Sequence, residues 1–283
     1  MRESADLNGA IQQAAEALRT ADALLIGAGA GMGVDSGLPD FRGAEGFWKA
    51  YPPFRGRQFA ELSTPHWFTT DVTLAWGFFG HRLNLYRAAV PHAGFATLLR
   101  WGQALPQGCF VFTSNVDGQF QKAGFPDERL LECHGSIHFL QCHRACGRPI
   151  WPADQVQVDV DDATIRARSQ PPACPACGAV ARPNILMFGD GKWDDRRTAD
   201  QELRYQHWLR QVRGKRVVAV ELGAGTAIPT VRYECQGRST VLIRINPRDP
   251  SVPAGAISLP LGAREALARI DERLPKPRGS TLR

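Results

Sequence analysis

The sequence predicts an α/β protein whose parallel β-sheet is covered by helices on both faces and interrupted by two insertions. Short apolar segments of strand length alternate with segments of helical periodicity, a pattern typical of parallel sheets. Each apolar segment ends in glycine or a small polar residue, and ligands bind at that edge of such sheets. Four of the seven cysteines fall into two close pairs outside this alternation.

Apolar spacing defines the predicted strands and helices. Strands are predicted at residues 23–26, 109–113, 216–222 and 240–245. Helices are predicted at residues 6–20, about 194–213 and about 262–274. Together they form a Rossmann-like domain assembled from residues 1–43, 95–136 and 184–275. The remaining segments are an aromatic-rich helical module at 44–94, a cysteine-containing module at 137–183 and a flexible tail at 276–283.

Composition narrows the class of protein. With 43% hydrophobic residues among 283, the chain has enough apolar surface for a sizeable core. We expect a cytoplasmic protein, because no apolar run approaches the roughly 20 residues of a membrane span and the N-terminus lacks a signal-peptide core. The net charge of +6 comes mostly from dispersed arginines. A membrane or nucleic-acid partner is therefore not expected, and the oligomeric state stays open.

A glycine-rich loop follows the first predicted strand. Its glycines at 27, 29, 31, 33 and 37 would let the backbone approach a phosphate, although their spacing is not G-x-G-x-x-G. Asp40, Phe41 and Arg42 come next and suit a dinucleotide, with Arg42 pairing with phosphate and Phe41 covering a reactive ring. The alternatives are a glycine turn without a ligand and a local Asp40–Arg42 ion pair.

Two further segments carry polar side chains suited to catalysis. Asn115 and Asp117 follow the second predicted strand and can bond amides and hydroxyls, or can simply form an Asp-Gly turn. His134 stands in the sequence Cys-His-Gly. Because imidazole titrates near neutral pH, His134 is a candidate general base, with a structural histidine as the alternative.

The paired cysteines predict a metal site. Cys142 and Cys146 form one pair, and Cys174 and Cys177 form the other. Four thiolates from two short loops make a closed tetrahedral zinc site, which is structural because no ligand position stays open. Such a site explains how a segment with little apolar surface folds. His143 is an alternative ligand within the first pair.

These motifs together resemble the sirtuins, NAD-dependent protein lysine deacylases of the bacterial type. The similarity covers roughly residues 10–270. It is carried by the segments GAG, SGLPDFRG, TSNVDG, CHGS, ARPNILMFGD, LGAGTAI and IRIN, and by the two cysteine pairs. Departures from the family pattern are the TSN and FGD motifs, Gly33, and GAGT where GTSL is usual.

The resemblance implies a role for each motif. NAD would be bound by Gly29, Ala30, Gly31, Asp40, Phe41, Arg42, Ser114, Asn115, Asp117, Gly223, Gly225 and Asn246. The catalytic residues would be His134, Asn115 and Asp117. An acylated-lysine protein or peptide would bind as a strand near Ile185, Leu186, Phe188 and Gly189. Zn²⁺ would be structural.

The implied reaction yields nicotinamide, deacylated lysine and O-acyl-ADP-ribose. The acyl-lysine carbonyl oxygen attacks the ribose as nicotinamide leaves, and His134 then accepts a proton from a ribose hydroxyl. Water hydrolyses the resulting bicyclic intermediate to free lysine and O-acyl-ADP-ribose. Two alternatives stay open on the same fold: a mono-ADP-ribosyltransferase or NAD hydrolase, and a sensor of NAD or ADP-ribose without turnover. The acyl-chain preference and the physiological substrates are not predicted.

Overall fold

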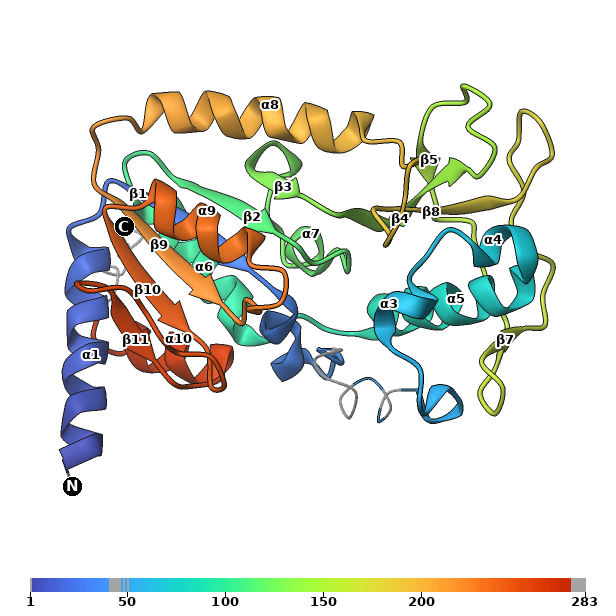
Figure 1. Ribbon diagram of the computed structural model, residues 1–283. Coiled ribbons are helices and arrows are strands. Elements are labelled where there is room, and N and C mark those ends of the chain that lie inside the picture. The colour runs from blue at the N-terminus through green and yellow to red at the C-terminus, as the bar shows by residue number, and fades with distance from the viewer. Residues whose placement is uncertain (1, 41–46, 48, 50, 276–283) are drawn as a thin grey trace, which may run out of the picture.

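The computed structural model describes residues 2–40, 47, 49 and 51–275 (Figure 1). Phe41, Arg42 and the predicted tail at 276–283 lie outside the described residues. Within the described part, no helix is long and apolar enough to cross a bilayer.

The main sheet has six parallel strands in the order β11-β10-β9-β1-β2-β3. Their bounds are β1 Ala23–Ala28, β2 Cys109–Thr113, β3 Leu130–Glu132, β9 Val217–Leu222, β10 Val241–Ile245 and β11 Ile257–Leu259. Four of these match predicted strands. The strands β3 and β11 were not predicted, because three residues are too few to show a periodic pattern.

Helices cover both faces of this sheet, as predicted (Figure 1). Alternate side chains of β1 divide between the two faces: Leu24 and Ile26 pack on one, and Ala23 and Leu25 on the other. The first face is covered by α1 (Arg2–Arg19), α6 (Ala93–Ala104) and α10 (Ala263–Asp271). The second is covered by α8 (Arg196–Gln211) and α9 (Thr230–Arg238). Burial on both faces explains why the strands are apolar throughout.

Short helices connect these elements. They are η1 (Ala30–Ser36), η2 (Pro52–Phe54), α3 (Phe59–Leu62), α4 (Trp67–Thr70), α7 (Gln119–Lys122) and η3 (Asp127–Arg129). The long helix of the helical module is α5 (Val72–Ala88). It presents buried side chains on most of its surface, which indicates that other elements enclose it.

The second insertion forms small antiparallel sheets. One has the order β5-β4-β8, with β4 at Gly135–Cys142, β5 at Trp151–Pro152 and β8 at Ala181–Ile185. The other pairs β6 (Val160–Asp161) with β7 (Arg166–Ala167).

The two insertions share one apolar core, although the sequence suggests separate modules. Trp76 of α5 donates a hydrogen bond of 3.0 Å to the Ala181 carbonyl of β8. Gly77 of the same helix faces the β6–β7 hairpin, where an added Cβ would lie 2.1 Å from the Ile165 carbonyl oxygen. The insertions therefore form a single body beside the main sheet.

Candidate active site

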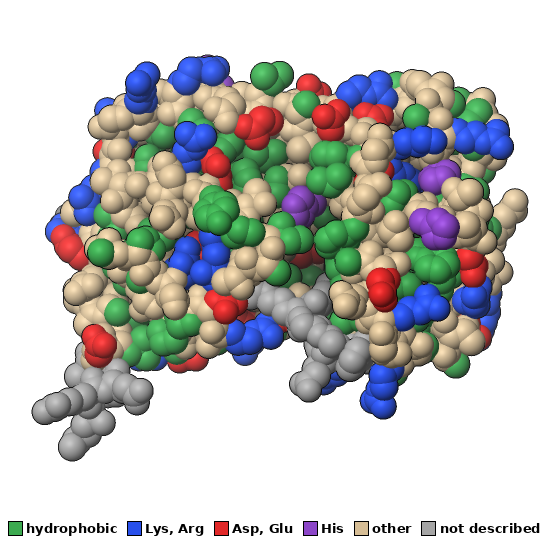
Figure 2. Space-filling model, in the orientation of Figure 1, with side chains coloured by type: hydrophobic (Ala, Val, Ile, Leu, Met, Phe, Trp, Pro, Cys, Tyr) green, Lys and Arg blue, Asp and Glu red, His purple; other side chains and the backbone are tan. Residues whose placement is uncertain are grey.

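A cavity of about 1280 Å³ opens where the carboxyl ends of β1, β2 and β9 face the joined insertions. Figure 2 shows this face of the molecule hollowed in its middle, with hydrophobic side chains on both sides. Most of the predicted site residues line the cavity: Gly29, Ala30, Asp40, Ser114, Asn115, Asp117, His134, Ile185, Leu186, Phe188, Gly189 and Gly225. The structure thus brings together segments far apart in the sequence.

Gly29, Gly31 and Gly223 allow two loops to touch backbone to backbone. The Gly29 N–H donates to the Leu222 carbonyl at 2.9 Å, and the Gly31 N–H donates to that of Gly223 at 3.2 Å. A Cβ added to Gly31 would lie 2.7 Å from the Gly223 Cα, which no real side chain tolerates. Gly31 and Gly223 therefore pack against each other, while Gly29 also reaches the cavity.

The loop after β2 is bonded to this glycine loop. The Ser114 N–H donates to the Ala28 carbonyl at 3.1 Å. The Asn115 side-chain amide donates to the Gly29 carbonyl at 3.0 Å. The polar residues after β2 and the glycines after β1 are therefore held as one wall of the cavity.

Asp117 is a buried carboxylate in that wall. Its side chain accepts a hydrogen bond of 3.0 Å from the Gln119 N–H. Burial raises the pKa of Asp117 to about 6, and the nearby charge of Glu132 adds to this while that of Arg82 opposes it. A buried carboxyl group with a strongly raised pKa is typical of a functional site.

His134 lies between the main sheet and the small one. The chain turns at Gly135, whose φ is +76° and whose added Cβ would lie 2.2 Å from the Asn184 carbonyl oxygen. The Leu186 N–H donates to the His134 carbonyl at 3.0 Å. Burial lowers the pKa of His134, opposed by a hydrogen bond to the Ser114 backbone. The imidazole is therefore neutral near pH 7 and can accept a proton.

A buried polar network holds the strand that leads to His134. Glu132 of β3 forms an ion pair with Arg197 of α8. The Gln201 side chain accepts from the Glu132 N–H at 3.0 Å and donates to its carboxylate at 3.3 Å. The sequence does not reveal this network, because Glu132 lies 65 and 69 residues before its partners Arg197 and Gln201.

The cavity floor is aromatic and contains a buried cation that sequence reasoning also missed. Arg82 is 4% exposed and donates to the Tyr86 hydroxyl at 3.2 and 3.1 Å. Its guanidinium lies 5.4 to 5.6 Å from the ring centroids of Phe59, Phe78, Phe79 and Tyr86. The sequence feature that could have indicated this buried cation is a single arginine within the mostly apolar segment 74–86.

The predicted peptide-binding residues follow β8. Leu186 and Phe188 are 39% and 43% exposed at the cavity rim. The Phe188 N–H donates to the Ser63 carbonyl at 2.9 Å, which joins this loop to the helical module. A fully buried ion pair between Arg182 and Asp190, at 2.6 Å, fixes the loop from behind.

Asn246 and Asp40 have partners that the sequence did not suggest. Asn246 is buried, does not line the cavity, and donates to the Ala224 carbonyl at 2.9 Å. Asp40 forms an ion pair with Arg248, which lines the cavity and follows β10. The alternative Asp40–Arg42 pair involves a residue outside the described part of the chain.

Four cysteine thiols converge in the second insertion. The Sγ atoms of Cys142, Cys146, Cys174 and Cys177 all lie within 4.8 Å of one another. The Cys142–Cys177 and Cys146–Cys174 pairs are 3.6 and 3.7 Å apart. A tetrahedral zinc with Zn–S bonds of about 2.3 Å has S–S edges of about 3.8 Å, so the cluster fits structural zinc. The His143 imidazole lies outside it, 2.8 Å from the Thr69 hydroxyl.

The class of protein defined here is a parallel-sheet α/β protein with a ligand cavity at its strand ends and a four-cysteine metal module. The chain belongs to the Sir2 family, whose family model matches residues 29–209.

Known relatives match between about two thirds and nine tenths of this chain. An NAD-dependent protein deacylase of Thermus thermophilus is 28% identical over 271 residues, covering 91% of this chain and 92% of the relative. NAD-dependent protein deacylase 2 of Pseudomonas aeruginosa is 33% identical over 184 residues, covering 65% and 67%.

Solved structures share the fold. A Sir2 homologue in complex with NAD has a TM-score of 0.67 at 20% identity, over 92% of this chain and 93% of that one. A Sir2 protein bound to acetylated peptide has a TM-score of 0.63 at 17% identity, over 93% and 97%.

Proposed function

We propose that this protein is an NAD-dependent protein lysine deacylase that produces nicotinamide, deacylated lysine and O-acyl-ADP-ribose. The observation that carries the proposal is a neutral, half-buried imidazole at His134 that lines a cavity between two glycine loops and an aromatic floor. Relatives that match over 91% of this chain are named NAD-dependent protein deacylases. NAD is the second substrate, and Zn²⁺ has a structural role.

In this proposal the strand-end loops bind NAD. Asn115 and Asp117 orient the ribose next to nicotinamide, since both line the cavity beside His134. Gly29, Ala30 and Gly225 face the ADP portion. The shapes of these loops are fixed by residues that do not line the cavity: Gly31, Gly223 and Asn246.

His134 acts as the general base on a ribose hydroxyl. Burial lowers the pKa of His134, so the side chain is unprotonated at neutral pH. It takes up the hydroxyl proton as the ribose oxygen bonds to the acyl carbon, which forms the bicyclic intermediate that water then hydrolyses. The surrounding aromatic side chains, Phe47, Phe59 and Tyr86, exclude water from the reacting sugar. Without that exclusion the glycosidic bond would simply hydrolyse.

The acylated peptide would extend along the loop after β8. Leu186 and Phe188 offer exposed apolar surface at the rim, and the loop is fixed by hydrogen bonds to Ser63 and His134. An extended peptide adds naturally to such a backbone edge. The acyl-lysine side chain would then enter the cavity toward the ribose.

The test offers the purified protein NAD and a panel of acyl-lysine peptides, with products measured by mass spectrometry. We expect nicotinamide, free lysine peptide and O-acyl-ADP-ribose in equal amounts, and only when an acyl peptide is present. His134→Ala should reduce lysine release by about 10²-fold or more. ADP-ribose release without peptide, or protein labelling, would instead favour the NAD hydrolase or the mono-ADP-ribosyltransferase.

A further inference from the structure

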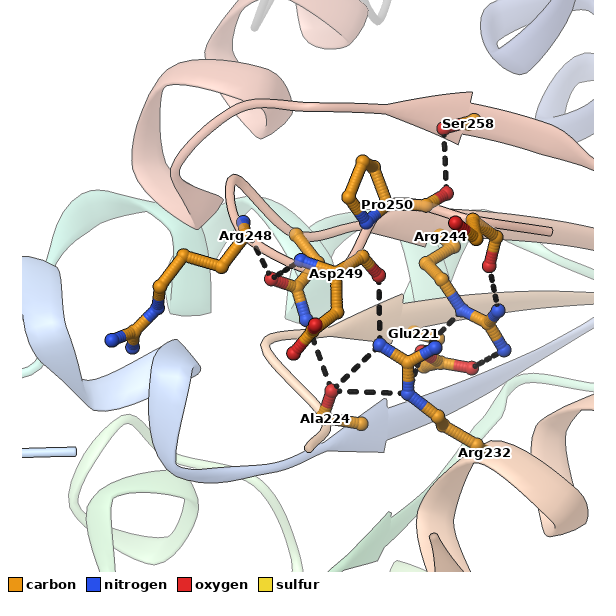
Figure 3. Close-up of polar contacts among 10 residues, drawn as sticks. Glu221, Ala224, Arg232, Arg244, Arg248, Asp249, Pro250 and Ser258 are labelled. Carbon is orange, nitrogen blue, oxygen red and sulfur yellow. Dashed lines mark hydrogen bonds and ion pairs between the residues drawn. The ribbon is translucent and has the colours of Figure 1, made fainter. Parts of the chain in front are cut away.

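A buried polar cluster locks together the loops that follow β9 and β10 (Figure 3). The carbonyl of Ala224, in the first loop, accepts from the Asn246 side chain at 2.9 Å and from Arg232 at 3.1 Å. Arg232 also donates to the Asp249 carbonyl at 2.7 Å. The Asn246 side-chain oxygen accepts from the Arg248 and Asp249 N–H groups, both at 3.0 Å. The backbone of Arg248 is therefore fixed.

The cluster continues into the sheet below these loops. Glu221 of β9 and Arg244 of β10 are register partners and form a buried bidentate ion pair at 2.7 and 2.8 Å. Arg232 of α9 approaches the same carboxylate at 4.0 Å. Two guanidinium groups thus share one carboxylate beneath the loops that carry Arg248.

The Arg248 side chain points away from the cluster (Figure 3) and lines the cavity. It is 53% exposed and meets Asp40, which comes from the loop after η1. Among the described residues, the permanent cations that line the cavity are Arg248 and Arg82. Arg82 is 4% exposed and surrounded by aromatic rings, whereas the Arg248 side chain is largely exposed to the cavity. Arg248 is therefore the cation better placed to contact a bound ligand.

We propose that Arg248 binds the pyrophosphate of the dinucleotide, exchanging the Asp40 carboxylate for a phosphate oxygen. This rests on the dinucleotide lying in the cavity, as in the proposed function. In doubly wound sheets the pyrophosphate lies at the first strand-to-helix turn, and Ala30 of that turn lines the same cavity as Arg248. A guanidinium can donate two parallel hydrogen bonds to two phosphate oxygens. Because the Arg248 backbone is already fixed, less conformational entropy is lost when the ligand binds.

The experiment compares two probes that differ in their phosphates. ADP-ribose carries the pyrophosphate, whereas adenosine carries none. Calorimetric titration of both would be run on the full chain, on Arg248→Met, which removes the charge at similar length, and on Arg248→Lys, which retains it. Arg238→Met is the matched control, because Arg238 is an exposed arginine of α9 that pairs with Glu234 and does not line the cavity.

We expect Arg248→Met to weaken ADP-ribose binding by about tenfold, and to reduce its salt dependence, while adenosine binding changes less than about twofold. Arg248→Lys should keep most of the affinity, and Arg238→Met should bind like the unaltered protein. Equal melting temperatures would confirm that the variants fold.

Unchanged ADP-ribose binding by Arg248→Met would overturn the proposal. So would an equal loss of adenosine and ADP-ribose, because Arg248 would then shape the loop and not bind phosphate. If the unaltered protein bound neither probe, the dinucleotide site would fail as well, an outcome distinct from a failure of Arg248 alone.

Discussion

Asp117 is a carboxylate that the fold buries at a cost in stability. Its pKa of about 6, raised by burial, exceeds the ordinary value of 3.8. The folded state therefore holds a proton more tightly than the unfolded state does. The cost is fully present above pH 6 and disappears as the pH falls toward 4, and it amounts to about 3 kcal/mol.

Asp117→Asn should therefore stabilise the protein at pH 7.5 by up to about 3 kcal/mol, while it reduces deacylation. The gain should shrink as the pH falls from 6 to 4, because the native carboxyl then becomes neutral too. Urea unfolding of both proteins across this range measures the difference. Asp154→Asn provides the exposed control. A stability difference that stays constant with pH would contradict this account.

Residue by residue, the sequence indicates the groups with special chemistry and misses those defined by distant partners. His134, Asn115 and Asp117 stand out, and the structure places all three on one cavity. Arg248 gave no signal, because its partner Asp40 lies 208 positions earlier and only the folded sheet brings them together. Phe41 and Arg42 stay predictions from sequence.

At the level of elements, the cysteine cluster supports more than its own loops. Cys142 ends β4, which carries the chain from His134 into the second insertion. The apolar core of that insertion also includes α5 and the aromatic residues of the helical module. Zinc binding should therefore stabilise the helical wall of the active-site cavity as well.

We expect one zinc ion per chain by native mass spectrometry, and its loss in Cys174→Ser. Chelation should lower the melting temperature by several degrees and speed hydrogen exchange in both β8 and α5, because these elements share one core. Zinc added back should reverse both effects. A metal-free chain with an unchanged melting temperature would contradict a structural zinc.

Element prediction succeeds where the pattern is long. The strands around Leu25, Val111 and Val220 are apolar throughout because helices cover both of their faces. The strands β3 and β11 are too short for a pattern, and they form because neighbouring strands supply hydrogen-bond partners. Secondary structure set by such tertiary pairing is not visible in the local sequence.

For the whole molecule, the sequence predicts a sheet with two insertions but not how the insertions pack together. The glycines of α5 are the physical reason for that packing, since Gly77 and Gly80 admit the β6–β7 hairpin and Val158. In the sequence, glycines within a helix only lower the predicted helix propensity. Their role in packing becomes visible once the hairpin and Val158 lie against them. The joined insertions form the wall opposite the strand ends and thereby create the cavity.

The most direct measurement is a crystal structure of the protein with ADP-ribose bound. We expect a hydroxyl of the ribose distal to adenine to lie about 2.6–3.2 Å from the His134 imidazole, beside Asn115 and Asp117. A ribose bound elsewhere, with His134 out of hydrogen-bonding range of every sugar hydroxyl, would contradict this expectation.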